Sequence, residues 1–417
     1  MNATTRIEQA LLACDALHQQ AIDLGLDRIC ALLAKLGNPH LHLPPVIHVA
    51  GSNGKGSCIA FVAAMAQAQG LRVHVHTSPH LLCLNERFVL AGQPIADAQL
   101  ADLLEEVLQI NQGAPATQFE LLIAAMFLVF SRTPADIVII ETGLGGELDA
   151  TNVVPDPALS IITPITLEHT DWLGSKISGI AAAKAGIIKP NCPVISAAQM
   201  DVARDILQIT AEKNRASIQF MAEDFSALHE DARLVWQDER QLLDLPLPTL
   251  PGAHQIENAA LAIAAAVHFG WPQSAIATGL TKVHWPGRLQ KIIPIPPLSP
   301  DTEMWLDGAH NPHAAKALAA FLRQQNQQRP AELHLVVAMQ STKDVAGFLA
   351  HFEALQPNIH LVPLQHAPAL AAKTEQYGSG ASVHASVQQA FQAISEQPVR
   401  LVVTGSLYLV GEVLGMR

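Results

Sequence analysis

The sequence predicts an α/β protein with a mostly parallel sheet in a large N-terminal domain and a smaller αβ domain at the C-terminal end. Apolar runs rich in β-branched residues alternate with helical patterns, which is typical of a parallel sheet covered by helices. A stretch with four prolines in nine residues (292–300) interrupts this alternation, which then restarts. Because 417 residues are too many for one ordinary core, we expect more than one domain.

The individual elements follow from the same alternation. In the first part of the chain we expect strands at 45–50, 72–77, 136–141, 158–164 and 193–197, and helices at 55–69, 97–110, 119–131 and 201–214. A less regular region at 218–250 suggests short strands with turns, and a helix follows at 256–270. In the last part we expect strands at 303–307, 333–339, 359–364 and 399–404, and helices at 313–325, 344–354 and 384–395. Since prolines join neither helices nor central strands, we predict domains at 1–291 and 301–417, with 292–300 as the linker.

Composition excludes several classes of protein. A net charge of −12 argues against broad nucleic-acid binding, which needs Lys and Arg to neutralise phosphates. No apolar stretch approaches the roughly 18 residues of a membrane helix, and Glu8 and Asp15 interrupt the N-terminal segment where a signal peptide needs an apolar core. The five cysteines are scattered and form no CxxC pair, which favours reduced thiols over disulfides or a zinc site. We therefore expect a cytoplasmic protein without membrane or nucleic-acid partners, and a monomer.

A glycine-rich turn, GSNGKGS at 51–57, joins a predicted strand to a predicted helix. Gly51, Gly54 and Gly56 permit close backbone approach, the helix N-terminus supplies free N–H groups, and Lys55 adds a positive charge. Ser57 is placed to offer its hydroxyl to Mg²⁺. The spacing departs from GxxxxGK[ST], because the turn is shorter and Gly56 separates Lys55 from Ser57. The turn is thus a predicted phosphate loop, with an ordinary strand-to-helix turn as the alternative.

Acidic residues and a histidine follow two further strands. Glu141 ends the strand at 136–141, and Glu168, His169 and Asp171 follow the strand at 158–164. Phosphate-loop enzymes hold their metal with a carboxylate at the carboxyl edge of a parallel sheet. We therefore predict that these residues lie at the same edge as the phosphate loop.

Ten segments in order resemble the ATP-dependent Mur ligase superfamily and, within it, the bifunctional dihydrofolate synthase/folylpolyglutamate synthase family. They are IDLGLDR (22–28), GSNGKGS (51–57), TSPHLLCLNERF (77–88), TQFE (117–120), ETGLGGELDATN (141–152), EHTDWLG (168–174), KAGIIKP (184–190), HQIENAALA (254–262), PGR (286–288) and DGAHNP (307–312). The resemblance implies a Mur-ligase-like phosphate-loop ATPase domain followed by a smaller, Rossmann-like αβ domain.

The resemblance also implies roles for single residues. Catalysis would rest on Lys55, His169, Lys184 and His310, with Lys184 matching a lysine that the family carbamylates. Ser57 and Glu141 would bind one Mg²⁺ ion, and His169 with carbamylated Lys184 a second. K⁺ would be a further cation. ATP would be contacted by Ser52, Asn53, Gly54, Lys55, Gly56, Ser57, Asn258, Arg288, Asp307 and His310. The pterin side would be formed by Asp27, Arg28, Pro79, His80, Thr117, Phe119, Leu148, Asp149 and Ala150.

The implied reaction is an ATP-dependent addition of L-glutamate to 7,8-dihydropteroate and to reduced folates through an acyl phosphate. Two departures from the family pattern stand out: Glu147 replaces an arginine usual in that segment, and only Lys343 and Asp344 remain of an acidic-basic repeat. The alternatives are a Mur ligase that adds an amino acid to a cell-wall precursor and a non-synthetic phosphate-loop NTPase.

Overall fold

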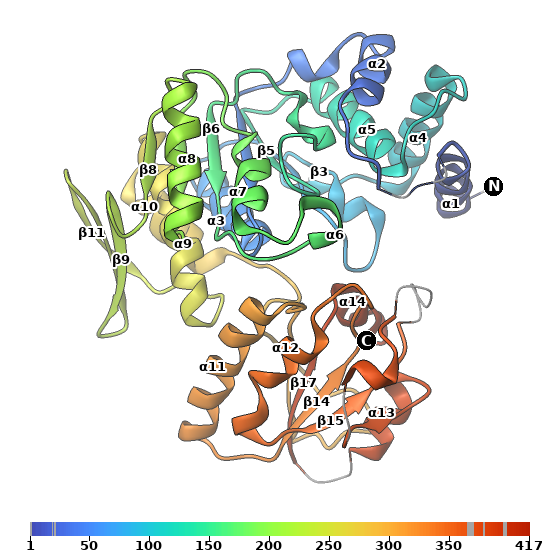
Figure 1. Cartoon of the computed structure of the whole chain (residues 1–417), viewed down its shortest axis with the longest axis vertical. Helices are drawn as coiled ribbons and strands as arrows, with labels where there is room; N and C mark the ends of the chain where they lie inside the picture. Colours follow the sequence, from blue (N-terminus) through green and yellow to red (C-terminus); the bar gives the residue numbers. More distant parts are fainter. Residues whose placement is uncertain (1, 19, 21, 365–370, 378–379, 395–397) are drawn as a thin grey trace. The chain divides into compact units, whose positions relative to one another are not determined.

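The computed structural model describes residues 2–18, 20, 22–364, 371–377, 380–394 and 398–417. The chain forms two compact units (Figure 1): unit 1 holds the residues up to Thr249 together with Ile256–Val283, and unit 2 holds Leu250–Gln255 and His284–Arg417. The mixed α/β class with a large, mostly parallel sheet and a second, smaller domain is confirmed.

The sheet of unit 1 has the order β4-β3-β2-β5-β1-β6-β7-β8. Its parallel strands are β1 (Val46–Ala50), β2 (Val73–His76), β5 (Ile137–Glu141), β6 (Leu159–Ile162), β7 (Val194–Ser196) and β8 (Ile218–Phe220). The short strands β3 (Val89–Leu90) and β4 (Gln93–Pro94) extend one edge in antiparallel pairing. β1 lies in the middle, between β5 and β6, so the residues that follow it emerge at the centre of the carboxyl edge.

Helices cover this sheet. Along the chain they are α1 (Ala3–Asp15), α2 (Asp27–Lys35), α3 (Lys55–Ala68), α4 (Asp97–Asn111), α5 (Gln118–Arg132), α6 (Thr170–Leu173), α7 (Ile177–Ala185), α8 (Asp201–Lys213), α9 (Ala253–His268) and α10 (Gln273–Lys282). Helices α1, α2, α4 and α5 share one apolar core with Val46, Val138 and Ile140 of the sheet. Helices α7 and α8 form a second core with Ala50 and Ile162, and α10 packs on α3. In Figure 1, α7 and α8 lie in front of the sheet and α3 lies behind it.

A three-stranded antiparallel sheet projects from unit 1. It consists of β9 (Phe225–Glu230), β10 (Arg233–Asp238) and β11 (Leu242–Pro246) in the order β11-β10-β9. Trp236 anchors it, because the buried indole stacks on Phe225 and donates to the carbonyl of Ala260 at 3.2 Å. The short strands predicted at 218–250 are thus β8 at the edge of the large sheet and the three strands of this small sheet.

Unit 2 is built on a six-stranded sheet of order β12-β13-β17-β14-β15-β16. Its strands are β12 (Gln290–Ile292), β13 (Glu303–Leu306), β14 (Leu333–Val337), β15 (Asn358–Leu361), β16 (Ser382–Val383) and β17 (Arg400–Thr404), and only β12 pairs antiparallel. Its helices are α11 (Pro312–Gln328), α12 (Val345–Ala350), α13 (Val387–Ala393) and α14 (Leu407–Gly415). Because β12 pairs with β13, the proline-rich residues 293–300 lie inside unit 2.

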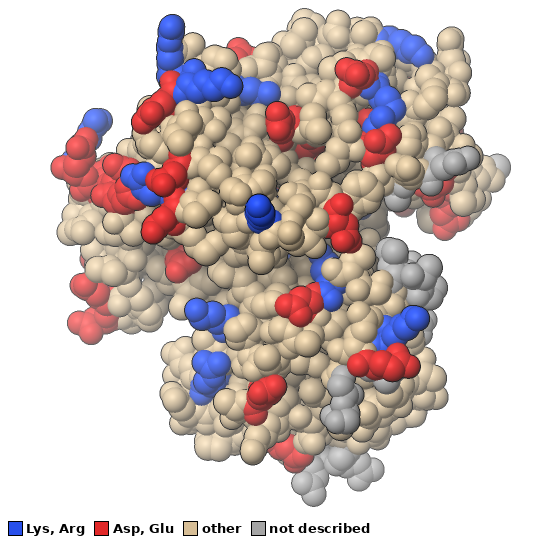
Figure 2. All heavy atoms as spheres, viewed as in Figure 1, with Lys and Arg blue, Asp and Glu red and all other residues tan. Residues whose placement is uncertain are grey.

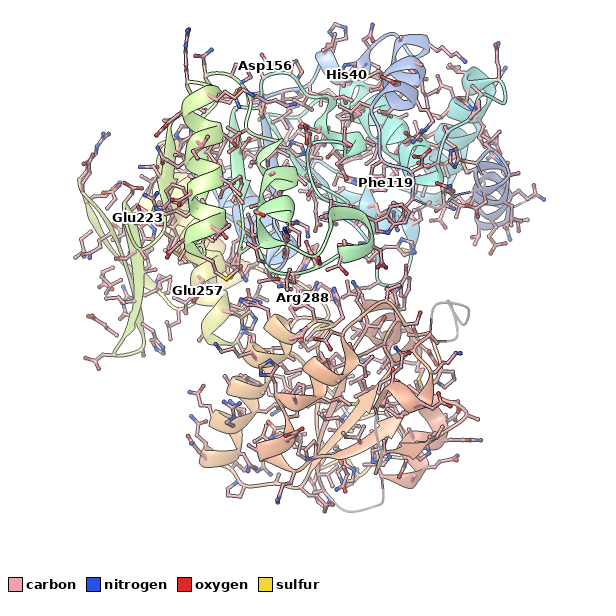
Figure 3. All side chains as sticks on the ribbon, viewed as in Figure 1. His40, Phe119, Asp156, Glu223, Glu257 and Arg288 are labelled. Carbon is pink, nitrogen blue, oxygen red and sulfur yellow. The ribbon has the colours of Figure 1, made fainter. Side chains whose placement is uncertain are left out.

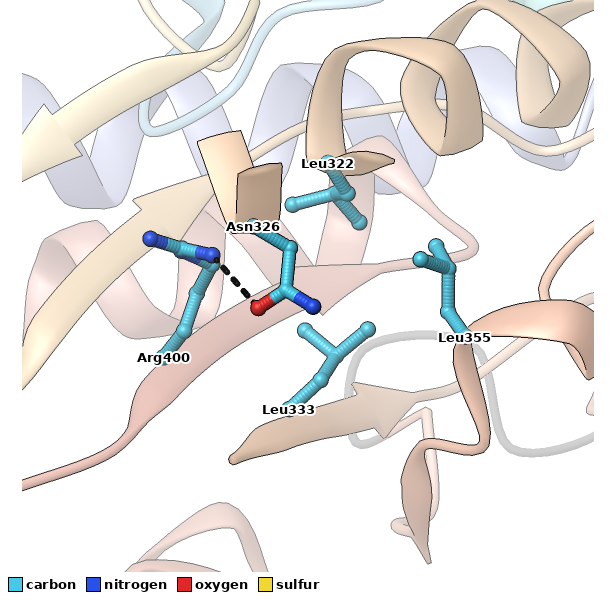
Figure 4. A pocket seen from close by; sticks show the side chains of 5 residues that line it. All are labelled: Leu322, Asn326, Leu333, Leu355 and Arg400. Carbon is cyan, nitrogen blue, oxygen red and sulfur yellow. Dashed lines mark hydrogen bonds between the residues drawn. The ribbon is translucent and has the colours of Figure 1, made fainter. Parts of the chain in front are cut away.

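A small pocket in unit 2 is lined by Leu322, Asn326, Leu333, Leu355 and Arg400 (Figure 4). Arg400 is 1 % exposed, and its guanidinium donates to Glu303 Oε2 at 2.8 Å and to the carbonyl of Arg329 at 3.0 Å. This arginine therefore ties β17 to β13 and to the chain just after α11. Its charge is neutralised inside the unit, so we interpret the pocket as a packing gap.

Most predicted strands begin and end within two residues of those in the structure. Helix 344–354 was wrong in length: α12 stops at Ala350, and a separate 3₁₀ turn follows at Glu353–Leu355. Helix 384–395 is shorter as well, since Ser386 caps α13, and residue 395 lies outside the described part of the chain. No helix in the described ranges has the length and apolarity that crossing a membrane requires. On the face shown in Figure 2, Lys and Arg are interspersed with Asp and Glu.

Candidate active site

The glycine-rich turn follows β1 and forms a tight loop in front of α3, which begins at Lys55. Gly51 and Gly54 have φ of 144° and 90°, conformations that L side chains rarely adopt. A Cβ at Gly51 would also lie 1.8 Å from Thr163 Oγ1, so only glycine fits against this residue, which directly follows β6. The N-terminus of α3 therefore opens onto the carboxyl edge of the sheet, as an anion-binding loop requires.

Lys55 faces the carboxylate at the end of β5. Lys55 Nζ lies 3.0 Å from the carbonyl oxygen of Gly51 and 3.9 Å from Glu141 Oε1. Glu141 is 5 % exposed, and Glu141 Oε2 accepts from the backbone N–H of Ser78 at 3.2 Å. Ser57 is buried on the first turns of α3. The structure thus places the lysine and the carboxylate of the prediction side by side.

Lys184 and Glu168 form a buried ion pair beside the same loop. Lys184 Nζ donates to Glu168 Oε1 at 2.7 Å and to the carbonyl of Gly51 at 2.9 Å. Burial acts to raise the pKa of Glu168, but the positive charges of Lys184 and Lys55 overcome it and lower that pKa to about 2. Burial lowers the pKa of Lys184, although Glu168 opposes this shift. Glu168 thus stabilises the charged form of Lys184 at a buried position, where burial favours the neutral form.

The loop after β6 supports the other side of the turn. Ser52 Oγ donates to the carbonyl of Thr166 at 3.1 Å and accepts from its backbone N–H at 3.0 Å. Asn53 Nδ2 donates to Thr166 Oγ1 at 3.2 Å. His169 sits just before α6 with φ of 48°, and Asp171 is exposed. Of the three polar residues predicted after this strand, Glu168 reaches the loop through Lys184, whereas Asp171 faces solvent.

Asn258 approaches the phosphate loop from α9. A Cβ at Gly54 would lie 2.3 Å from Asn258 Oδ1, so the amide rests directly on the backbone of the loop. Asn258 is 4 % exposed. The contact of Asn258 with ATP stays a prediction.

Unit 2 brings together the three remaining predicted ATP contacts. Asp307 accepts from the backbone N–H of Leu289 at 2.8 Å and of Ala309 at 2.9 Å. A Cβ at Gly308 would lie 2.2 Å from Arg288 Nη1, so this arginine packs on the same turn. His310 Nδ1 lies 2.9 Å from the carbonyl oxygen of Gly308. PGR and DGAHNP are thus adjacent within unit 2.

Two of the predicted acceptor-side segments are linked through Arg28. Its Nε donates to both oxygens of Glu120 at 3.1 Å, and its Nη1 lies 2.8 Å from Asp23 Oδ2. Glu120 also accepts from the backbone N–H and the hydroxyl of Thr117, which caps α5. The charge of Arg28 is therefore balanced by two carboxylates, and Thr117 serves first as a helix cap.

Phe119 is the second residue of α5 (Figure 3), and its ring packs on the glycine-rich segment after β5. A Cβ at Gly143 would lie 2.4 Å from Phe119 Cζ, so the ring needs a glycine there. The neighbouring Leu148 is 46 % exposed, whereas Asp149 and Ala150 are buried. The predicted aromatic platform thus lies against Gly143, at the start of this segment.

The loop after β2 carries Pro79 and His80. Arg87 Nε donates to His80 Nδ1 at 3.0 Å, and burial followed by the Arg87 charge lowers the pKa of His80 to about 4. Glu86 accepts the backbone N–H groups of Leu81, Leu82 and Cys83 and thereby orders the loop. Pro79 and Asp27 are exposed. Ser78, through its bond to Glu141, joins this loop to the phosphate-loop edge.

Sequence reasoning missed some residues that shape the site. Ser78, Thr163 and Thr166 hold the loops around the turn, yet single serines and threonines give no signal in a sequence. Glu147 is exposed and its backbone N–H donates to Ala183, so the departure at this position lies on the surface. Asp344 caps α12 by accepting from Gly347 N at 2.8 Å. Among the described residues, no group of three His, Cys, Asp or Glu side chains could bind a metal by itself.

Comparisons with known proteins agree with this geometry. The family model of the Mur ligase middle domain matches residues 49–266, and that of the dihydrofolate synthetase C-terminal domain matches residues 296–368. The chain is 34 % identical to a Bacillus subtilis dihydrofolate synthase/folylpolyglutamate synthase, covering 84 % of this chain and 83 % of the relative. Its Escherichia coli counterpart is 32 % identical over 95 % of this chain and 92 % of the relative.

Solved structures match over the whole length. The structure of Escherichia coli FolC in complex with DHPP and ADP has a TM-score of 0.87 at 30 % identity, covering 100 % of this chain and 98 % of that one. A bifunctional folylpolyglutamate synthase/dihydrofolate synthase with Mn, AMPPNP and L-glutamate bound has a TM-score of 0.86 at 31 % identity, with the same coverage.

The fold and the phosphate-loop site define a Mur-type ligase. Within this superfamily, the chain belongs to the dihydrofolate synthase/folylpolyglutamate synthase family. The predictions of fold class, of family and of an ATP-dependent ligase are therefore confirmed.

Proposed function

We propose that this chain adds L-glutamate, at the expense of ATP, to 7,8-dihydropteroate and to reduced folates. The observation that carries the proposal is the phosphate loop itself, with Lys55 beside Glu141 and with Lys184 on the carbonyl of Gly51. It is supported by relatives whose names include both synthase activities and by a similar structure that holds L-glutamate together with an ATP analogue.

ATP would lie along the loop, its phosphates facing Lys55 and the free N–H groups at the start of α3. Asn258, already packed on Gly54, would contact the same nucleotide. Arg288, Asp307 and His310 of unit 2 stay predicted ATP contacts. Their closeness within unit 2 supports this proposal, since Arg288 packs against Gly308 in the turn that carries Asp307 and His310.

The residues at the carboxyl edge fit one divalent cation. Ser57 and Glu141 offer a hydroxyl and a carboxylate, and Mg²⁺ commonly takes one or two such protein ligands while phosphates supply others. This explains why no described cluster of three ligands is needed. Bound there, the ion would neutralise phosphate charge. Mg²⁺ as the metal is our proposal, and the similar structures that contain Mn with AMPPNP support a divalent ion.

A second cation would need a change at Lys184. In the structure this lysine donates to Glu168 and Gly51, and an ammonium group cannot bind a metal. A carbamate on Lys184 would supply a carboxylate that, together with His169, is the predicted ligand set of the second ion. We expect His169→Ala to raise the Mg²⁺ concentration needed for half-maximal activity, and an unchanged Mg²⁺ titration would contradict its role as a ligand.

The chemistry needs no protein nucleophile. Transfer of the γ-phosphoryl group to the acceptor carboxylate gives an acyl phosphate, and attack by the glutamate amine then forms the amide and releases phosphate. The contribution of the chain is to orient the reactants and to neutralise developing negative charge, with Lys55 of the phosphate loop as the predicted cation at the phosphates. Residues 143–150 and Phe119 would form the acceptor side.

The test is ADP release measured with dihydropteroate and with tetrahydrofolate, each with and without L-glutamate. We expect release that depends on both an acceptor and glutamate. Equal release without glutamate would indicate an NTPase, and activity only with a cell-wall nucleotide precursor would indicate another Mur ligase. A role for K⁺, the monomeric state and the cytoplasmic location stay predictions.

A further inference from the structure

Asp149, a predicted acceptor contact, directs its carboxylate into its own loop. Its Oδ2 accepts from the backbone N–H of Leu144 at 2.8 Å, and its Oδ1 accepts from the backbone N–H of Thr151 at 3.0 Å and from the Thr151 hydroxyl at 2.5 Å. A further backbone hydrogen bond comes from Gly143. With 2 % exposure and four donors, the carboxylate has little capacity left for a ligand.

The hydrogen-bond chain continues from Thr151 into the centre of the sheet. His48 Nε2 lies 2.9 Å from Thr151 Oγ1. Since the threonine has a single hydroxyl proton and gives it to Asp149, His48 must donate through Nε2–H. His48 is fully buried on β1, between Ile140 of β5 and Ser160 of β6. The order of donation is therefore fixed as His48 to Thr151 to Asp149.

His48 stays neutral in this position. Burial, and then the charge of Lys189, lower the pKa of His48 to about 3. Its second nitrogen, Nδ1, is buried and meets no hydrogen-bond partner among the described residues. The single N–H of His48, on the strand that leads into the phosphate loop, thus donates to Thr151. Buried polar groups normally have a hydrogen-bond partner, and Thr151 is the partner of this one.

The loop held by Asp149 supports the aromatic ring on the acceptor side. Gly143, whose backbone bonds to Asp149, is covered by the ring of Phe119 so closely that no side chain would fit. The far end of the loop is fastened to the segment of Lys184, because Asn152 Nδ2 donates to the carbonyl of Gly186 at 3.1 Å. The position of the Phe119 surface thus depends on residues 143–152.

We propose that His48 and Thr151 are positioning residues for the acceptor: through Asp149 they hold the loop on which Phe119 packs, so that a flat pterin ring meets a preformed surface. They touch neither acceptor nor nucleotide. The inference rests on the proposed function and deepens it. It assigns part of the acceptor affinity to a row of hydrogen bonds that starts at His48, on the strand before the phosphate loop. Asp149 accordingly acts by holding residues 143–152 in place.

Thr151→Val and Thr151→Ser form a matched pair, since valine keeps the shape and loses the hydroxyl while serine keeps the hydroxyl. With Thr151→Val we expect the Kd of dihydropteroate for the ATP-analogue-loaded enzyme, and the acceptor KM, to rise roughly tenfold, because a buried donor and acceptor lose their partner. The KM for ATP should change less than about twofold, and Thr151→Ser should restore acceptor binding.

A second pair tests the first link of the chain. His48→Gln can still donate from a side-chain amide, whereas His48→Leu cannot, so only the leucine variant should raise the acceptor Kd. Melting temperatures measured in parallel separate misfolding from the proposed effect, since a merely structural role would alter acceptor and ATP binding together.

The outcomes that overturn the proposal are distinct. An unchanged dihydropteroate Kd in Thr151→Val would overturn it, as would a parallel loss of acceptor and ATP affinity that serine does not restore. A wild-type chain that binds dihydropteroate but releases no ADP in response to glutamate would overturn the proposed function alone. A wild-type chain that does not bind dihydropteroate would overturn both.

Discussion

Lys184 Nζ lies 2.7 Å from Glu168 Oε1, and both side chains are buried next to the carbonyl of Gly51. Sixteen residues of sequence separate the two partners, which come from α7 and from the loop after β6. Any carbamate formed on Lys184 must displace this contact. Unmodified Lys184, the residue that the family resemblance predicts to be carbamylated, is therefore paired with Glu168.

Lys184→Ala should abolish glutamate-dependent ADP release, because it removes both the ion pair and the predicted carbamate. If the carbamate carboxylate is what activity requires, added short-chain carboxylic acids should restore part of the rate by filling the space of the lost side chain. The measurement is a titration of ADP release against acetate or propionate. The same acids should not stimulate the wild-type chain, and absence of rescue at any concentration would contradict a catalytic carbamate.

Glu168→Gln should destabilise unit 1 by about 3–5 kcal/mol, because it leaves a buried lysine without its counter-charge. The wild-type pair also predicts a pH dependence. The folded-state pKa of Glu168 is lowered to about 2 from the roughly 4.3 of an unfolded chain, so its contribution to stability is full above pH 4.3 and is lost as the pH falls towards 2. Urea unfolding at several pH values checks this. If the free energy of unfolding fell equally for wild type and Glu168→Gln between pH 5 and pH 2, the ion pair would not be the source of the pH dependence.

Lys55→Ala should lower the rate of ADP release at least about a hundredfold with either acceptor, because no other charge on the loop replaces it at the phosphates. Lys213→Ala is the matched control, since Lys213 is an exposed lysine at the end of α8. Fold can be verified by circular dichroism. Activity retained within a few-fold in Lys55→Ala would remove the loop lysine from the reaction.

Three histidines of unit 2 should make its stability sensitive to acid. His334 Nδ1 lies 3.0 Å from His360 Nε2, and His360 Nδ1 lies 3.0 Å from His384 Nε2. Burial, and then the neighbouring imidazoles, lower the pKa of His360 to about 4. Because this value lies below the roughly 6.5 of the unfolded chain, the stabilisation is present above pH 6.5 and is lost as the pH falls towards 4.

Thermal unfolding at pH 7 and pH 5 measures this effect. Replacing His360 by leucine should reduce the difference between the two pH values, whereas replacing the exposed His229 should not. An unchanged pH dependence in His360→Leu would refute the role of the three histidines.

The strands and the phosphate loop could be predicted because their signals are local. Strand β1 and the helix after it follow from the apolar run 45–50 and the glycines at 51, 54 and 56, and the structure places both within one or two residues. Helices α7 and α14 were missed because their sequences are short and almost uniformly apolar or small, so no polar face marks their period.

The pairings of side chains could not be predicted, since they depend on which elements meet in space. Nothing local joins Lys184 to Glu168, Asn258 to Gly54 or His48 to Thr151. The same holds for β12: its three residues precede a proline-rich stretch, yet they pair with β13 because the antiparallel edge of that sheet is open to them.

The central claim is that phosphate is transferred to the carboxylate of the acceptor before glutamate attacks. It is tested most directly with dihydropteroate whose carboxylate carries ¹⁸O, by mass spectrometry of the phosphate released in the presence of ATP and L-glutamate. The acyl-phosphate route predicts that one ¹⁸O atom per turnover appears in phosphate. Unlabelled phosphate formed together with the glutamylated product would contradict it.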